Sequence, residues 1–229
     1  MKSRQYIPED TVRRLFLYYR ALIDLPQYIE IASKALGGYP HDAQVTSSDE
    51  LSRLTGCSAA QIRKDLTYFG QFGTPGKGYR VVELVKQIKS ILGINRDWEV
   101  ALVGVGNLGR ALIAYAGLHA QGFKITRVFD NQPAKIDKLV GRLKIKNIAS
   151  ISRELTGSNI KIGIITVPAS AAQKVTDAMV ESGIKTMLNF APIRLYIPDG
   201  VKVLDIDMTS HLTRLSFYLV QSNKPSKNK

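Results

Sequence analysis

The chain has 229 residues, of which 45% are hydrophobic and 22% charged, a balance that suits one large or two ordinary globular domains. No apolar run approaches the roughly 20 residues of a membrane-spanning helix, and the N-terminus lacks the apolar segment of a secretory signal. One cysteine, Cys57, excludes an internal disulfide framework and favours a cytoplasmic protein. The three histidines match no metal-ligand spacing.

The formal net charge is +13 and the isoelectric point is about 9.8, which favours a polyanionic partner such as nucleic acid. Residues 1–97 hold 14 Lys and Arg against 10 Asp and Glu, and residues 98–229 hold 18 against 9. The basic excess is therefore spread along the chain, and local motifs must identify any nucleic-acid surface.

The first predicted helix begins at Pro8, has acidic residues in its first turn and ends before Pro26. Two short helices follow, with Ser47 and Ser58 as N-caps. Glu50 and Gln61 stand at their capping-box positions, and Gly56-Cys57 breaks the chain between them. Two capped helices joined by a turn of about three residues are typical of a helix-turn-helix.

The second of these helices has one apolar face, formed by Ile62, Leu66 and Phe69, which we expect to be buried. Its other side is polar and basic, as expected of a helix that enters a DNA groove. That side carries Gln61, Arg63, Lys64, Thr67 and Tyr68. The glycine-rich stretch 72–80 then predicts a tight hairpin, or wing, whose basic residues approach phosphates or a minor groove. An ordinary small helical domain with solvated charges remains an alternative interpretation.

A helix over 82–92 precedes the run Gly104-Val105-Gly106-Asn107-Leu108-Gly109. This run follows an apolar strand at 100–103 and opens a helix over 110–120, which is the context of a dinucleotide fingerprint. Gly104 is expected to make the tight turn, Gly106 to admit a pyrophosphate, and Gly109 to let the helix pack on the strand. The helix N-terminus would face the phosphates.

Asp130 ends the next strand, 21 residues beyond Gly109. A carboxylate there accepts hydrogen bonds from adenine-ribose hydroxyls and repels a ribose phosphate, which favours NAD(H) over NADP(H). The basic residues Lys135, Lys138 and Arg142 moderate that preference. Asp130 could alternatively cap only the following turn.

Further strands are expected at 162–167, 186–190 and 201–205, with a helix over 171–181 that Ser170 and Gln173 would cap as a box. This alternation predicts an α/β fold with a doubly wound parallel sheet. Thr166-Val167-Pro168 and Asn189-Phe190-Ala191-Pro192 fall at strand ends, where such sheets bind ligands. A last helix carries an apolar stripe of Met208, Leu212, Leu215 and Leu219. Periodicity alone favours packing of that stripe on its own sheet.

Taken together, several segments resemble the Rex redox-sensing transcriptional repressors of bacteria. They are the segment 58–70 (SAAQIRKDLTYFG), the glycine run 104–109, Gly183-Ile184-Lys185, Leu188-Asn189-Phe190-Ala191-Pro192 and Asp205-Ile206-Asp207. The resemblance implies a homodimer with N-terminal winged helices, C-terminal Rossmann domains and a final helix that is exchanged between subunits. It implies a repressor that binds palindromic, A·T-rich operators when it is NAD⁺-loaded or nucleotide-free and releases them when NADH accumulates.

By position in the family motifs, Arg63 and Lys64 would lie in the major groove and Tyr115 near the nicotinamide. Arg20 would pair with Asp207 across subunits in one of the two states. Two residues depart from the family pattern. Pro75 stands where the wing usually has an arginine, which Lys77 replaces less well because lysine lacks the planar fork. Met208 follows the switch aspartate where some relatives carry an aromatic residue; methionine fills such a volume flexibly.

The expected organisation is a winged-helix domain over 1–80, a connecting helix over 81–97, a Rossmann NAD(H)-binding domain over 98–206, a dimerisation helix over 207–221 and a disordered tail over 222–229. The expected DNA-facing residues are Ser47, Ser58, Gln61, Arg63, Lys64, Tyr68, Lys77 and Tyr79. The expected cofactor residues are Gly104, Val105, Gly106, Asn107, Leu108, Gly109, Tyr115, Asp130, Thr166, Val167, Pro168, Asn189, Phe190, Ala191 and Pro192.

The function that we expect is NADH-responsive repression without catalysis. A dehydrogenase would need an acid–base group beside the nicotinamide, and none of His41, His119 and His211 falls at a loop on the ligand edge of the sheet. An NAD-dependent dehydrogenase and a regulator that binds CoA or another nucleotide remain the alternatives.

Overall fold

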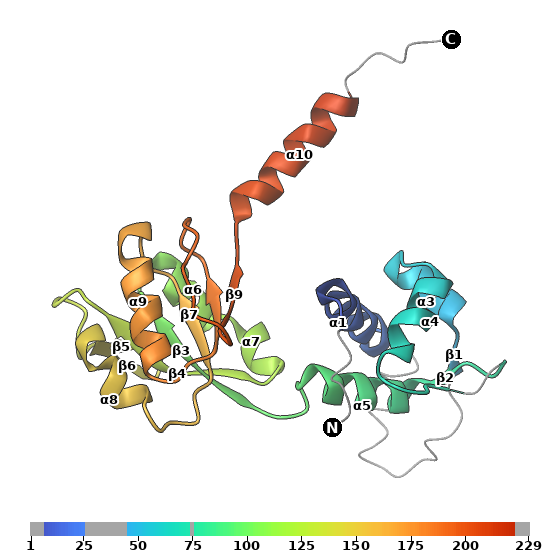
Figure 1. Cartoon of the computed structure of the whole chain (residues 1–229), viewed down its shortest axis with the longest axis horizontal. Coiled ribbons are helices and arrows are strands. Elements are labelled where there is room, and N and C mark those ends of the chain that lie inside the picture. Colours follow the sequence, from blue (N-terminus) through green and yellow to red (C-terminus); the bar gives the residue numbers. More distant parts are fainter. Residues whose placement is uncertain (1–6, 26–44, 74–75, 223–229) are drawn as a thin grey trace. The chain divides into compact units, whose positions relative to one another are not determined.

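The computed structural model describes residues 7–25, 45–73 and 76–222. The chain divides into two compact units, Met1–Arg96 and Asp97–Lys229 (Figure 1). Pro75, His41 and the expected tail beyond Ser222 lie outside the described residues.

The first unit is a small helical domain with one two-stranded sheet (Figure 1). Its elements are α1 (Glu9–Ile23), β1 (Val45–Thr46), α3 (Ser48–Thr55), α4 (Ala59–Thr67), β2 (Tyr79–Arg80) and α5 (Val81–Leu92). Pro8 is the N-cap of α1, where its missing N–H costs no helical hydrogen bond.

The predicted caps of the helix pair are confirmed. Ser47 Oγ accepts from the Glu50 N–H at 3.0 Å, and Ser58 Oγ accepts from the Gln61 N–H at 3.2 Å. Gly56 ends α3 with a left-handed φ of 70°, which favours glycine. The reciprocal half of each box is not formed, because the Glu50 carboxylate accepts from Thr46 Oγ1 and the Gln61 amide donates to Asp65.

The wing differs from the expected hairpin. The strands that pair are β1, before the helix pair, and β2, after it, with Val45 opposite Arg80 and Thr46 opposite Tyr79. No strand pair forms inside the described part of 72–80. Gly78 allows this closure, since a Cβ at that position would lie 2.4 Å from the Thr46 carbonyl oxygen.

Helix α5 belongs to the first unit. Residues expected to form only a connector over 81–97 supply Val81, Leu84, Val85 and Ile88 to the apolar core of this unit. These four side chains pack with buried residues of α1, α3 and α4. The sequence pattern predicted the helix itself. It did not predict that the helix packs on α1, α3 and α4, because that depends on residues distant in the sequence.

The second unit is built on a seven-stranded sheet in the order β5-β6-β4-β3-β7-β8-β9. All neighbouring strands are parallel except β5 and β6. From β6 to β9 this is the strand order of a Rossmann fold, so the predicted doubly wound fold is confirmed. The elements are β3 (Trp98–Val103), α6 (Asn107–Ala114), α7 (Ala116–Ala120), β4 (Phe123–Asp130), β5 (Leu139–Val140), β6 (Leu143–Asn147), α8 (Ile151–Leu155), β7 (Ile162–Ile165), α9 (Ala169–Glu181), β8 (Thr186–Asn189), β9 (Lys202–Asp205) and α10 (Met208–Ser222).

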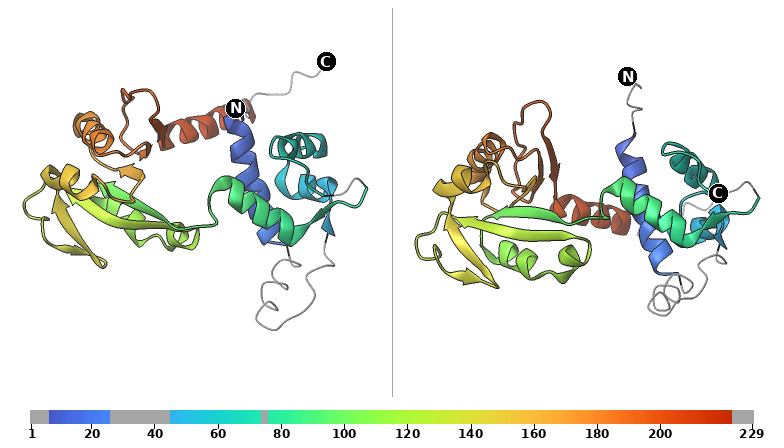
Figure 2. Two further views of the ribbon diagram at one scale, coloured as in Figure 1. Left: turned by 60° about the horizontal axis from the view of Figure 1, so that its bottom comes forward. Right: turned by 90° about the horizontal axis from the view of Figure 1, so that it is seen from below.

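Helices cover both faces of this sheet (Figure 2). On one face, α8 and α9 pack on alternate residues of β3, including Ala101 and Val103. On the other face, α6 covers Val100 and Leu102. The central strand is therefore buried on both sides, which is why it reads as a continuous apolar run.

Three local predictions in this unit are corrected. The helix expected over 110–120 begins at Asn107 and breaks at Tyr115, whose extended ψ of 101° separates α6 from α7. Helix α9 begins at Ala169 with Pro168 as its N-cap, so Ser170 lies inside the helix and caps nothing. Gln173 instead bonds Asp177 and the backbone of Tyr196.

Helix α10 does not bury its apolar stripe against its own sheet. Met208, Leu212, Leu215 and Leu219 are all at least 58% exposed in the single chain. The intrachain packing that periodicity favoured is therefore wrong for the chain in isolation.

Candidate functional site

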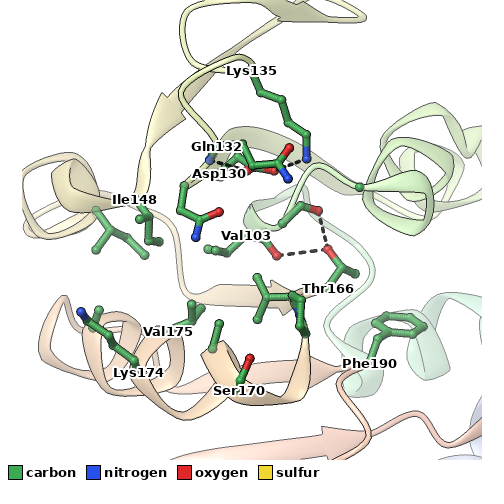
Figure 3. A pocket seen from close by; sticks show the side chains of 18 of the residues that line it. Val103, Asp130, Gln132, Lys135, Ile148, Thr166, Ser170, Lys174, Val175 and Phe190 are labelled. Carbon is green, nitrogen blue, oxygen red and sulfur yellow. Dashed lines mark hydrogen bonds and ion pairs between the residues drawn. The ribbon is translucent and has the colours of Figure 1, made fainter.

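A cavity of about 1070 Å³ in the second unit opens at the carboxyl ends of β3, β4, β7 and β8. Strands β3 and β7 lie at the centre of the sheet, where the strand order reverses. Ligands of open α/β sheets bind at this switch point. Figure 3 shows Asp130, Gln132 and Lys135 on one side of the cavity and Ser170, Lys174 and Val175 on the other.

The three glycines of the fingerprint occupy different environments. Gly104 has a φ of 103°, and a Cβ there would lie 2.5 Å from the Thr166 carbonyl oxygen. A Cβ on Gly109 would lie 2.1 Å from the Gly104 carbonyl oxygen, so α6 packs directly on the turn. A Cβ on Gly106 would meet nothing within 4 Å, although Gly106 lines the cavity at the start of α6. This open approach to a helix N-terminus suits a phosphate group.

Thr166 fixes the glycine turn from the neighbouring strand. Its backbone N–H donates to the Val103 carbonyl at 2.9 Å. Its hydroxyl lies 2.7 Å from the Gly104 carbonyl oxygen and 3.1 Å from that of Val103 (Figure 3). Thr166 therefore shapes the cavity as well as lining it.

Asp130 is buried at the end of β4 and accepts three hydrogen bonds. Oδ2 accepts from the Val105 N–H at 2.8 Å and from Lys135 Nζ at 2.9 Å, and Oδ1 accepts from the Gln132 N–H at 2.9 Å. Burial alone would raise the pKa of this carboxyl, but the bonds from Gln132, Lys135 and Val105 outweigh burial and lower the pKa. Asp130 is therefore a charged acceptor that holds both the glycine turn and the turn that follows it.

The cavity brings together most of the predicted cofactor residues but not all. Those that line it are Gly104, Gly106, Asn107, Leu108, Asp130, Thr166, Val167, Pro168 and Phe190. Those that do not are Val105, Gly109, Tyr115, Asn189, Ala191 and Pro192.

Asn189 and Tyr115 show why. Asn189 is buried and holds the loop after β8, donating to Asp205 and to the Ala191 carbonyl and accepting from the Ala191 N–H. Tyr115 is 62% exposed and its ring lies over Gly117, where a Cβ would be 2.5 Å from the ring. Neither placement gives these residues a cavity-facing side chain in the single chain.

Sequence reasoning missed about half of the residues that line the cavity. The helix α8 and the turn before it were not predicted, and α9 was expected to start later. The additional lining residues are Val103, Asn131, Gln132, Lys135, Ile148, Ala149, Ile151, Ser152, Ser170, Ala171, Lys174, Val175 and Ala178. A signal was present in α9, where Ala171, Lys174, Val175 and Ala178 recur at helical spacing.

In the first unit, α4 has the predicted division into faces. Ile62 and Leu66 are buried, while Arg63, Lys64 and Thr67 are exposed. Phe69, the third residue expected on the buried face, follows the end of α4 and is only half-buried. Arg63 is also held by a hydrogen bond from its guanidinium to Ser48 Oγ, at 2.7 Å. Ser48 was not predicted, because its role depends on α3 and α4 lying side by side.

The other predicted DNA-facing residues are less uniform. Ser47 and Ser58 act as caps, and the Gln61 side-chain amide donates to buried Asp65. Tyr68 is half-buried and Lys77 exposed. Tyr79 is half-buried in a groove of about 540 Å³ that it shares with Ser48, Arg63 and Thr67.

The predicted switch residues fall in different units. Arg20 is exposed on α1, and Asp207 caps α10 by accepting from the N–H groups of Thr209 at 2.9 Å and Ser210 at 3.2 Å. Met208, the first residue of α10, is 68% exposed. Pairing of Arg20 with Asp207 across subunits stays a prediction.

The described parts of the chain contain no cluster of three or more metal-binding side chains. In the same parts, no helix has both the length and the apolar character of a membrane span.

Comparison with known proteins matches both units. Residues 6–67 match the family model "Putative DNA-binding protein N-terminus", and residues 95–193 match "CoA binding domain". A redox-sensing transcriptional repressor Rex from Desulforamulus reducens is 40% identical, covering 95% of this chain and 98% of the relative. The Rex of Chloroflexus aurantiacus is also 40% identical, covering 98% of this chain and 100% of the relative.

Solved structures agree with the sequence relatives. The Rex-family repressor RSP in complex with β-NAD⁺ and operator DNA superposes with a TM-score of 0.83 at 31% identity, covering 95% of this chain and 94% of that one. RSP in complex with β-NADH gives a TM-score of 0.78 at 29% identity, covering 95% and 96%. The chain belongs to the Rex family of redox-sensing transcriptional repressors.

Proposed function

We propose that this protein is an NAD(H)-responsive transcriptional repressor that binds operator DNA and releases it when NADH binds. One observation carries the proposal: a single chain joins a capped helix pair, with the basic residues Arg63 and Lys64 exposed on its second helix, to a Rossmann cavity with a dinucleotide fingerprint. The complexes of RSP with β-NAD⁺ and operator DNA and with β-NADH support the same combination of ligands here.

In this proposal the pyrophosphate lies against Gly106 and the N-terminus of α6, and Asp130 accepts from the adenine ribose. NADH regulates the protein only if it binds the DNA-incompetent arrangement more tightly than the DNA-competent one. A shift from 1:99 to 99:1 needs about 5.5 kcal/mol of differential binding. The uncharged dihydronicotinamide enters a poorly solvated site more readily than the cationic ring of NAD⁺, which supplies a physical basis for discrimination.

On the DNA side, Arg63 and Lys64 of α4 would contact the major groove and Lys77 the minor groove. A palindromic, A·T-rich operator requires two copies of α4 related by two-fold symmetry. The exposed apolar stripe of α10 supports a homodimer in which this helix packs on a second copy of the chain.

The cavity supports a sensor over an enzyme. A dehydrogenase needs a proton donor or acceptor beside the reacting carbon. The residues that line the described cavity include no His, Cys or Tyr; of its two lysines, Lys135 is paired with Asp130 and Lys174 lies on α9. His119 lies on α7 and His211 on the exposed α10, outside the cavity lining.

The test is a titration of a fluorescent palindromic, A·T-rich duplex at fixed salt, because phosphate contacts make DNA affinity depend on salt. We expect NADH to weaken binding, and NAD⁺ and NADPH to weaken it much less. Equal DNA affinity with and without saturating NADH would contradict the proposal. Release by CoA in place of NADH would favour the ligand class named by the matched domain model, and turnover of NADH with small carbonyl substrates would favour a dehydrogenase.

A further inference from the structure

The largest network of side-chain hydrogen bonds in the described part of the first unit centres on Asp65 of α4. The carboxylate is fully buried. It accepts from Arg14 Nε at 2.6 Å, the second Arg14 nitrogen at 2.8 Å, Tyr18 Oη at 2.7 Å, Gln61 Nε2 at 2.8 Å and Thr11 Oγ1 at 3.3 Å. Nothing in the proposed contacts with DNA or nucleotide uses this group.

The donors on α1 form one stripe of that helix. Thr11, Arg14 and Tyr18 are spaced at i, i+3 and i+7, so they share the face that meets α4. The Arg14 guanidinium donates to both oxygens of the Asp65 carboxylate. Such a bidentate pair fixes the relative orientation of the two side chains as well as their distance. Its guanidinium also bonds Thr11 Oγ1 at 3.2 Å, which links the donors to one another.

The network holds a charge inside the unit. Burial alone would raise the pKa of Asp65, but the hydrogen bonds from Arg14, Tyr18 and Gln61 and the charge of Arg14 lower it. Burial and Asp65 raise the pKa of the Tyr18 hydroxyl, so that Tyr18 remains a donor. A buried charge that loses a partner is strongly disfavoured, and α1 and α4 are therefore held in one register.

Apolar contacts between the same helices would not fix that register. Leu15, Leu22, Ile62 and Leu66 belong to the shared core, but the free energy of apolar burial is non-directional. A carboxylate bonded at both oxygens does not slide. The polar link is thus the element that sets how α4 is oriented on α1.

Helix α1 also carries Arg20, two residues after Tyr18 and exposed at the surface. We propose that Asp65 is a positioning residue that couples α1 to α4, so that a displacement of α1 at Arg20 reorients the DNA-reading face of α4. This inference rests on the proposed function and on the predicted pairing of Arg20 with Asp207, which would tie α1 to one of the two states of the repressor. Arg63 and Lys64 immediately precede Asp65 on the same helix, so small rotations about Asp65 move both of them.

The test measures coupling, defined as operator Kd with saturating NADH divided by operator Kd without it. Asp65→Asn keeps the shape but removes the charge and two acceptor sites, and Tyr18→Phe removes one donor while keeping the ring. We expect coupling to fall about tenfold in Asp65→Asn and about threefold in Tyr18→Phe. The NADH affinity of the DNA-free protein should be unchanged. Arg13→Gln is the matched control, since Arg13 is an exposed residue of the same helix.

The outcomes separate positioning from simple stability. Loss of coupling with NADH binding retained supports the inference. Operator binding that weakens equally with and without NADH, with coupling unchanged, overturns it. If Asp65→Asn does not fold, Tyr18→Phe decides between the same two results. Absence of coupling in the wild-type chain would instead overturn the proposed function, and the inference with it.

Discussion

The Lys135 ammonium lies 2.9 Å from Asp130 Oδ2, and both side chains line the same cavity. The acidic residue at the end of β4 is therefore part of an ion pair and not an isolated negative charge. Asp130 Oδ2 also accepts from the Val105 N–H, so the same carboxylate stabilises the glycine turn. Nucleotide preference and loop geometry thus depend on the same carboxylate.

This pair predicts how the protein discriminates NADH from NADPH. Lys135→Met leaves the charge of Asp130 uncompensated, so repulsion of a ribose phosphate should increase the Kd ratio of NADPH to NADH by about tenfold. Asp130→Asn should shift the ratio the other way. Titrations monitored by NAD(P)H fluorescence measure both. Lys138→Met is the control, because Lys138 does not line the cavity. Equal changes for the two nucleotides would place the pair away from the adenine ribose.

Asp130→Ala is a less specific change than Asp130→Asn. It should also loosen NADH binding and raise relative tolerance of NADPH, but it removes every acceptor for the Val105 and Gln132 N–H groups. A fall in thermal stability should accompany the loss of affinity, since the buried Val105 donor is left unsatisfied at a cost of about 1–3 kcal/mol.

The glycines provide a matched pair of variants. Gly106→Ala should leave the unfolding temperature nearly unchanged, because a Cβ there meets no atom within 4 Å and φ is −82°. It should weaken NADH binding by at least about tenfold, since the methyl group occupies the approach of the pyrophosphate. Gly109→Ala should instead lower the free energy of unfolding by about 1–3 kcal/mol through overpacking. Its effect on NADH affinity should be the smaller one. Calorimetric unfolding and NADH titration measure stability and affinity for each variant. If Gly106→Ala lost stability and Gly109→Ala lost NADH affinity, the roles assigned to the two glycines would be contradicted.

Substitutions at Ser48 and Lys64 should change DNA binding in different ways. Ser48→Ala frees the Arg63 guanidinium and should relax discrimination at the base pair that Arg63 reads, by up to about 1–3 kcal/mol. Lys64→Ala should weaken binding to all sequences and reduce the salt slope by about 1, with NADH binding intact. Anisotropy with operator variants at several salt concentrations separates them. Uniform weakening by Ser48→Ala would show that Arg63 contacts only the backbone.

The stability of the first unit should depend on pH at both extremes. The pKa of Asp65 is lowered in the folded state, so its contribution is complete above the ordinary Asp value of about 4 and is lost as pH falls below it. The pKa of Tyr18 is raised, so its contribution is complete below about 10 and is lost as pH rises further. Chemical unfolding of wild type and Tyr18→Phe across pH 8–11 isolates the second effect. A variant that loses stability as steeply as wild type above pH 10 would contradict it.

The sequence predicts features that depend on neighbours in the chain. The caps Ser47, Ser58 and Gly56, the central strands and the glycine turn all follow from local hydrogen bonding and periodicity, and the structure confirms them. Features that depend on distant segments could not be predicted in this way. The partners of Asp65 lie 47 to 54 residues away on α1, apart from Gln61.

The incorrect predictions have equally physical causes. Serine is a common N-cap residue, but here Pro168 is the N-cap and α9 already begins at Ala169, before Ser170. Tyr115 stands in a run of good helix formers, yet the helix breaks there and its ring lies over Gly117. Two-residue strands such as β1 are too short to carry a periodic signal.

The place of α5 has a practical consequence for dissecting the protein. A cut after residue 80 would strip four side chains from the core of the first unit, whereas a cut after Arg96 would leave that core whole. The fragment 1–96 should therefore fold by itself and bind operator half-sites at any NADH concentration. Without α10 it would also lack the avidity of a dimer. Such a fragment would be a weak repressor that is permanently switched on.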